Sequence, residues 1–216
     1  CSPPLRSVGG PLSSVLRPLL NFILVKMSKS LYVIGKDNIP KDSKYVVTCT
    51  HESYNEVIMI GMALYPNQIH YMAKKELFKN KWIGKFLTSL NAFPVDRENP
   101  GPSTLKRPIN LLKDNKTVGI FPTGSRTSQE GAPLKRGAST IAMLSKSPIL
   151  PVAYVGPTKI HGLLTGQAYI NIGKPIDIND LPKDLKRNER IDYITKEIET
   201  RTAKLQQELH EIVKSL

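Results

Sequence analysis

The chain has 216 residues, of which 40% are hydrophobic and 23% charged, a balance that excludes a disordered chain and a protein with several membrane spans. Its 31 Lys and Arg residues against 18 Asp and Glu residues give a net charge of +13, which indicates a polyanionic partner such as an anionic membrane or a nucleic acid. The two cysteines, Cys1 and Cys49, fit no metal-binding or disulfide spacing, so we expect a reducing compartment and no metal site.

The N-terminal segment combines apolar periodicity with basic charge. Residues 1–36 carry five basic residues and no acidic one. Apolar residues recur every three or four positions from Leu12 to Leu31, which predicts an amphipathic helix. Its longest apolar stretch, Leu19–Val25, is interrupted by Asn21 and falls short of the roughly 18 residues that cross a bilayer. We therefore predict a helix in the membrane interface, where each cation near an anionic surface contributes roughly 1 kcal/mol, and the alternative is a helix packed on its own domain. The residues assigned to membrane binding are Leu16, Arg17, Leu20, Ile23 and Leu24.

Short β-branched or aromatic runs then alternate with helical patterns, which is typical of βα units. Strands are predicted at 32–34, 45–50, 69–73, 92–95, 117–121, 149–155 and 168–172, and helices at 53–65, 75–90, 103–114, 136–146 and after 183. Ser103 is expected to cap the third of these helices, with Leu105, Ile109 and Leu112 facing inward. The expected fold is a single α/β domain over residues 32–216, with a mostly parallel central sheet flanked by helices, preceded by the amphipathic segment 1–31.

A histidine and a carboxylate follow the strand that ends near Thr50. His51 and Glu56 are five residues apart, which places them about 140° apart on a regular helix. They can meet only if His51 lies in the turn before the helix begins. In that case Glu56 would hold one imidazole nitrogen while the other accepts a proton from an alcohol. The alternative is a surface histidine at a helix start.

Two further strand ends carry arginines. Phe121 to Thr127 contains Thr123, Gly124, Ser125 and Arg126, whose backbone, hydroxyl and guanidinium groups suit phosphate oxygens. The segment lacks the Gly-Lys-Ser/Thr ending of a P-loop and the Gly-x-Ser-x-Gly of a nucleophile elbow, so a plain turn is the alternative. Arg97 follows the strand that ends at Val95, although its neighbour Asp96 is also compatible with a structural ion pair. Because parallel strands end at one edge of a sheet, the three segments can form one pocket.

In their order, these segments resemble the glycerolipid acyltransferase family, in particular its bacterial 1-acylglycerol-3-phosphate members. The family's motifs are His-x4-Asp, Phe-Pro-Glu-Gly-Thr-Arg and a Val-Pro-Val strand. The corresponding residues here are His51 to Glu56, Phe121 to Arg126 and Leu150-Pro151-Val152. The resemblance extends over about residues 32 to 175.

The resemblance implies transfer of a fatty acyl group from acyl carrier protein or coenzyme A to the sn-2 hydroxyl of lysophosphatidic acid, forming phosphatidic acid, without cofactor or metal. His51 would be the general base and Glu56 its orienting carboxylate. The acceptor phosphate would contact Arg97, Thr123, Gly124, Ser125 and Arg126. The expected location is the cytoplasmic face of the cell membrane, as a peripheral or monotopic protein.

Three residues depart from the family motifs. Glu56 replaces Asp, Thr123 replaces Glu and Ser125 replaces Thr. The loss of a carboxylate beside Arg126 leaves two alternatives open, an acyltransferase for another lysolipid or alcohol and a catalytically silent membrane-binding member. Nucleic-acid binding is disfavoured, because aromatic residues that could stack on bases make up only 6% of the chain.

Overall fold

The computed structural model describes residues 31–42, 44–49, 54–96, 102–121, 128–158, 166–182 and 184–216. The strands in these ranges are β1 (Leu31–Ile34), β2 (Val46–Cys49), β3 (Ile69–Lys74), β4 (Ala92–Val95), β5 (Thr117–Ile120), β6 (Ile149–Val155) and β7 (Ala168–Ile172). The α-helices are α2 (Tyr54–Ala63), α3 (Lys81–Ser89), α4 (Pro102–Lys113), α5 (Ser128–Ser145) and α7 (Arg187–Lys214). Short 3-10 helices lie at η2 (Lys36–Asn38), η3 (Lys75–Phe78) and η4 (Ile178–Asp180).

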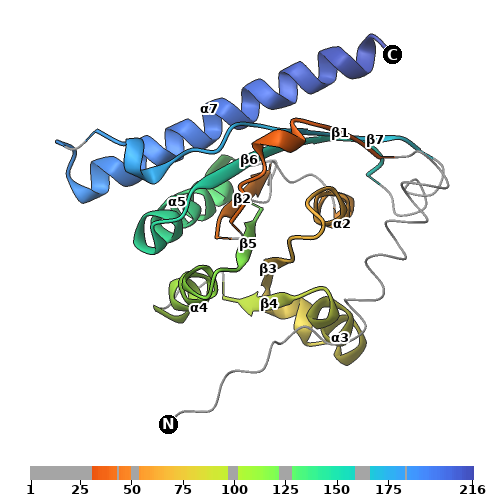
Figure 1. Cartoon of the computed structure of the whole chain (residues 1–216). Helices are drawn as coiled ribbons and strands as arrows, with labels where there is room; N and C mark the ends of the chain where they lie inside the picture. The colour runs from red at the N-terminus through yellow and green to blue at the C-terminus, as the bar shows by residue number, and fades with distance from the viewer. Residues whose placement is uncertain are drawn as a thin grey trace.

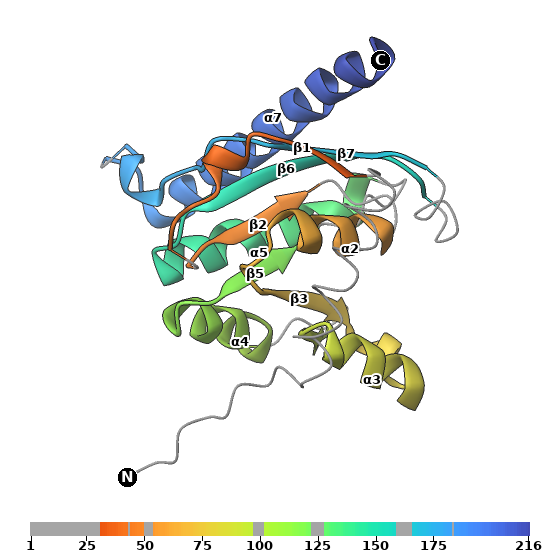
Figure 2. The ribbon, with the colours of Figure 1, turned by 45° about the vertical axis from the view of Figure 1, so that its right-hand side comes forward.

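The strands form one sheet in the order β1-β7-β6-β2-β5-β3-β4. Neighbouring strands from β6 to β4 are parallel, whereas β7 is antiparallel to β6 and parallel to β1. The carboxyl ends of β6, β2, β5, β3 and β4 therefore lie at one edge, as the arrows of β2, β5 and β3 show in Figure 2. The predicted α/β fold with a mostly parallel sheet is confirmed, and the bounds predicted for β4, β6 and β7 agree with those observed.

Helices cover both faces of the sheet, with α2 and α3 on one side and α4 and α5 on the other (Figure 1). Alternate residues of each strand point to opposite faces, so both faces need apolar side chains. Val47 and Leu150 belong to the core cluster under α2, whereas Val46 and Ile149 belong to the cluster under α4 and α5. The β-branched runs of the sequence form strands because both faces are buried.

Three predicted helix starts differ from the structure. The pattern over 75–90 divides into η3 and α3, because Asn80 is extended and its side chain accepts hydrogen bonds from the backbone N–H groups of Trp82 and Ile83. Ser103 is not an N-cap, since α4 already begins at Pro102, a residue whose fixed φ suits the first helical position. Helix α5 begins at Ser128, eight residues before the predicted start. The predicted inward residues of α4 are confirmed: Leu112 is buried, and Leu105 and Ile109 pack against the core.

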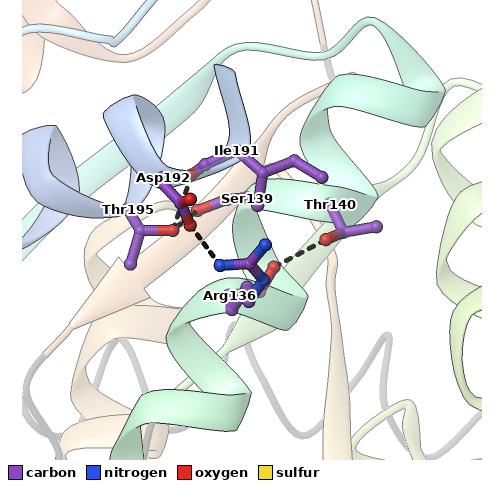
Figure 3. Close-up of polar contacts among 6 residues, drawn as sticks. All are labelled: Arg136, Ser139, Thr140, Ile191, Asp192 and Thr195. Carbon is purple, nitrogen blue, oxygen red and sulfur yellow. Dashed lines mark hydrogen bonds and ion pairs between the residues drawn. The ribbon is translucent and has the colours of Figure 1, made fainter. Parts of the chain in front are cut away.

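The long C-terminal helix α7 packs on α5 and on β6 and β7. Most of its charged side chains are exposed, whereas the opposite face buries Ile194 and Ile198. Figure 3 shows the polar part of the α5–α7 contact. Arg136 pairs with Asp192, and the hydroxyl oxygens of Ser139 and Thr195 are 2.8 Å apart. The contact between α5 and α7 thus combines an ion pair and a hydroxyl pair with the buried apolar side chains of α7.

The amphipathic helix predicted for the N-terminal segment lies outside the described residues, except for Leu31, which begins β1. Its membrane-binding assignment and the division at residue 31 therefore stay predictions. In the part of the chain that the structure describes, no helix is both long and apolar enough to cross a membrane.

Candidate active site

The ends of β2 and β5 lie side by side at the carboxyl edge of the sheet. Thr48 is paired with Ile120. In the sequence, β2 leads to the His51 segment, and β5 leads to the segment Phe121 to Thr127, which we name the glycine turn after Gly124. Strand β4, which precedes Arg97, is separated from β5 by β3, a distance of roughly 10 Å at the usual strand spacing. The strands that lead to the His51 segment and to the Phe121–Thr127 segment are thus direct neighbours. The strand that leads to Arg97, β4, is the second strand from β5.

Glu56 lies in the first turn of α2, directly above this edge. Its residue surface is only 3% exposed, so the carboxylate lies inside the domain rather than on the solvated face of the helix. A carboxylate in the first turn also interacts favourably with the positive end of the helix dipole. Glu56 is therefore not an ordinary surface residue of the helix.

Tyr154 of β6 forms the wall next to Glu56. Burial is the main cause that raises the pKa of Tyr154 to about 12, and the nearby Glu56 carboxylate and Cys49 thiol contribute to the same rise. The phenol is therefore neutral at physiological pH and donates a hydrogen bond to the Pro157 carbonyl at 3.1 Å. A negative charge, a neutral phenol and the end of β2 thus meet at the start of α2.

Asn55 fixes the start of α2 to the segment that follows β6. It is 1% exposed, and its Nδ2 donates to the same Pro157 carbonyl at 2.7 Å. Asn55 and Tyr154 therefore share one acceptor and hold Pro157 beside the first turn that carries Glu56. Neither residue was predicted as part of the site. The only signals are an amide inside the His51–Glu56 segment and a tyrosine in an otherwise apolar strand, because their contact depends on tertiary structure.

Aromatic side chains pack together where β5 ends. Phe121, the residue that follows β5, is buried and stacks on Tyr71 with ring centroids 5.7 Å apart. The Tyr71 hydroxyl donates to the Val57 carbonyl of α2 at 2.9 Å. A Cβ at Gly61 would come within 2.5 Å of that hydroxyl, so a side chain there would displace the Tyr71 phenol. The start of the glycine turn is thereby fixed to the helix that carries Glu56.

At the β4 end, Asp96 forms an ion pair with Lys75 of η3, with Oδ2 and Nζ 2.5 Å apart. Both side chains are partly exposed, so the pair contributes only about 0.2–1 kcal/mol. It connects the segments that leave β3 and β4.

The remaining predicted site residues lie outside the described residues. They are His51, Arg97, Thr123, Gly124, Ser125 and Arg126, together with Leu16, Arg17, Leu20, Ile23 and Leu24. Of the predicted site, the structure thus places Glu56 and the strand ends from which the other segments continue. Among the described residues, no group of three or more His, Cys, Asp or Glu side chains could hold a metal ion.

Comparison with known proteins identifies the family. Residues 30–155 match the family model described as Acyltransferase. The 1-acyl-sn-glycerol-3-phosphate acyltransferase of Bacillus subtilis is 46% identical over 191 residues, 88% of this chain and 95% of that protein. The protein of the same name from Streptococcus pneumoniae is 36% identical, over 89% of this chain and 72% of its own length.

A solved structure supports the fold. The crystal structure of the 1-acyl-sn-glycerophosphate acyltransferase from Thermotoga maritima matches with a TM-score of 0.60 and 20% identity, covering 94% of this chain and 84% of that one. The family model covers more than half of the chain and includes the three strand ends described above. The family predicted from the motifs is therefore confirmed, and the chain belongs to the acyltransferase family.

Proposed function

We propose that the protein transfers a fatty acyl group from an acyl carrier protein or coenzyme A thioester to the sn-2 hydroxyl of 1-acylglycerol-3-phosphate, forming phosphatidic acid. The main support for this function is the 46% identity to a protein named 1-acyl-sn-glycerol-3-phosphate acyltransferase, in a match that covers 95% of that protein's length. The buried Glu56 at the carboxyl edge of the sheet supports the same chemistry.

In the proposed reaction, His51 accepts the proton of the acceptor hydroxyl, and the hydroxyl oxygen attacks the thioester carbonyl carbon. The carbon–sulfur bond then breaks, and the leaving thiolate takes the proton from the imidazolium. Glu56 holds the other ring nitrogen and stabilises the imidazolium that forms between these steps. No covalent acyl-enzyme, cofactor or metal is part of this mechanism.

We propose that the acceptor phosphate contacts Arg126 and the Thr123–Ser125 backbone after β5, with Arg97 as a second cation. The support is topological, because the glycine turn continues from the strand next to β2. Arginine suits a phosphate through two parallel N–H donors.

The acceptor can be tested with a panel of lysolipids, measuring thiol release with acyl carrier protein and coenzyme A thioesters. We expect lysophosphatidic acid to be preferred over lysophosphatidylcholine and monoacylglycerol. Arg126→Ala should raise KM for lysophosphatidic acid by about 10-fold or more while kcat changes little, because removing a charge-assisted hydrogen bond costs about 1.5–3 kcal/mol. Arg136→Ala, a cation bound to Asp192 of α7, is the control. A preference for another lysolipid, an unchanged KM or the absence of transfer to every acceptor would each contradict the proposal.

We further propose that residues 1–31 form a membrane-interface helix that holds the acyltransferase domain, residues 32–216, on the cytoplasmic face of the cell membrane. Support comes from the apolar periodicity and from five basic residues without an acidic one in residues 1–36. Leu16, Arg17, Leu20, Ile23 and Leu24 would face the lipid. Deletion of residues 1–26 should weaken cosedimentation with vesicles that contain phosphatidylglycerol, and undiminished binding would count against this helix.

A further inference from the structure

Helix α3 presents its apolar side chains to solvent rather than to the domain. Trp82 is 83% exposed, Phe86 53% and Ile83 48%. These three residues, which we name the α3 ridge, follow one another on the outward side of a helix with only nine residues. An amphipathic helix of a globular protein ordinarily turns its apolar face toward the core. The ridge therefore needs a different explanation.

The domain contact of α3 does not use the ridge. Gly84 is the buried residue of the helix, and a Cβ there would come within 3.1 Å of the Phe78 carbonyl oxygen and 3.3 Å of its Cα. Leu87 packs against the core cluster under α2. Gly84 lies on the side of the helix opposite Trp82 and Phe86, and Leu87 lies between Gly84 and Ile83 around the helix. The fold therefore holds α3 in place while Trp82, Ile83 and Phe86 stay exposed.

Basic residues flank the ridge. Lys79, Lys81 and Lys85, named the α3 lysines, are exposed, and no acidic residue occurs between Glu76 and Asp96. Among the described side chains, none forms an ion pair with an α3 lysine. Exposed Trp and Phe beside lysines without compensating acids are typical of helices that lie in the interface of an anionic bilayer.

The position of α3 relates this surface to the candidate active site. Strand β3 lies between β5 and β4 and continues through η3 into α3. Helix α3 lies at the end of the sheet toward which the β3 arrow points (Figure 2). A surface bound to α3 would therefore lie beside the edge at which Glu56 is buried.

We propose that α3 is a membrane-docking element, with the α3 ridge in the headgroup–acyl boundary of an anionic bilayer and the α3 lysines on its phosphates. This contact is separate from the N-terminal helix proposed above and holds the carboxyl edge of the sheet against the lipid surface. A lipid surface is favoured over a protein partner because the strongly exposed Trp82 and Phe86 stand beside cations without acidic neighbours, which matches the anionic surface of a bilayer. Such a ridge can enter lipid without a matching groove.

Trp82 is the only tryptophan of the chain and reports directly on this contact. With the full chain, vesicles of phosphatidylglycerol should shift its emission to the blue, and phospholipids brominated on the acyl chain should quench it. Pure phosphatidylcholine vesicles should have a much weaker effect. Vesicle-bound protein whose Trp82 emission is neither shifted nor quenched would overturn the proposal.

Variants can distinguish vesicle binding through α3 from binding through the net positive charge of the whole protein. Replacing the three α3 lysines by alanine should weaken phosphatidylglycerol vesicle binding roughly 100-fold, since each near-surface cation contributes about a factor of five. The matched control replaces Lys196, Lys204 and Lys214 of α7, which removes the same charge elsewhere. Equal losses in both triple variants would contradict docking through α3. Acyl transfer to lysophosphatidic acid in detergent micelles should be unchanged in the α3 variant, so a failure of docking is distinguishable from a failure of the proposed activity.

Other occupants of the ridge give different results. An emission shift with acyl carrier protein but not with vesicles would identify an acidic protein partner. An emission maximum that depends on protein concentration without lipid would identify a second copy of the chain. A red shift on deletion of residues 1–30 would show that the N-terminal segment covers the ridge. Each of these outcomes would overturn the membrane proposal.

Discussion

Replacement of His51 by alanine should lower kcat for acyl transfer to lysophosphatidic acid by about 10² to 10⁴-fold, the contribution of a well-placed general base. The acceptor hydroxyl is a poor nucleophile while it keeps its proton. Without the imidazole, that proton loses the acceptor proposed for it. The loss should appear in kcat with little change in KM, because the phosphate contacts proposed after β5 remain.

Thiol release under saturating acceptor measures this loss, with purified protein whose thermal unfolding and vesicle binding match those of the unmodified chain. His210→Ala is the matched control, since His210 is an exposed residue of α7 whose Nδ1 lies 2.7 Å from the carbonyl oxygen of Gln206. Activity of His51→Ala close to that of the control would exclude His51 as the base. Full loss together with a lowered unfolding temperature would assign His51 a structural role.

Local sequence patterns predict most of the strands because both faces of the sheet are buried. The runs Ala92–Val95, Ile149–Val155 and Ala168–Ile172 begin and end where polar or turn residues interrupt the apolar sequence. The antiparallel orientation of β7 could not be predicted in this way. It depends on which strand β7 pairs with, and its partner β6 is selected by long-range packing of α7 across both.

Helix bounds were less predictable where a polar side chain competes for backbone hydrogen bonds. Asn80 interrupts an apolar periodicity that otherwise continues from Lys75 to Leu90, because its side chain caps a new helix. The same competition explains why the shorter helix α3 occurs where one helix over 75–90 was predicted. Periodicity alone also could not show that the apolar side of α3 points outward.

The candidate site was predictable to the extent that its residues follow strand ends. The order of the strands makes β2 and β5, which precede the His51 and Arg126 segments in sequence, direct neighbours, whereas β4 is separated from β5 by β3. Asn55 and Tyr154 were not predicted, because their roles depend on a shared carbonyl, that of Pro157, about 100 residues from α2 in sequence.

Replacement of Glu56 by glutamine should also lower kcat by about 10² to 10⁴-fold, although the side chain keeps its size. The buried carboxylate lies beside Tyr154 and Cys49, where little solvent compensates for a lost charge. Glutamine removes the negative charge that stabilises an imidazolium on His51. The acidic limb of the pH profile of kcat/KM should therefore move to lower pH, because the protonated imidazole becomes less stable.

Glu56→Asp is the variant that separates charge from packing. It keeps the carboxylate and restores the residue of the His-x4-Asp motif, but it shortens the side chain by one methylene, about 1.5 Å. If Glu56 orients His51, the aspartate variant should retain most of the activity that glutamine loses and keep the pH profile of the unmodified chain. If Glu56 only fills space, glutamine should be the milder change, since it preserves volume and aspartate leaves a cavity. A higher kcat for the aspartate variant than for the glutamine variant would therefore show that the carboxylate acts through the histidine, and the reverse order would show that Glu56 only fills space. Glu211→Gln on α7 is the exposed control.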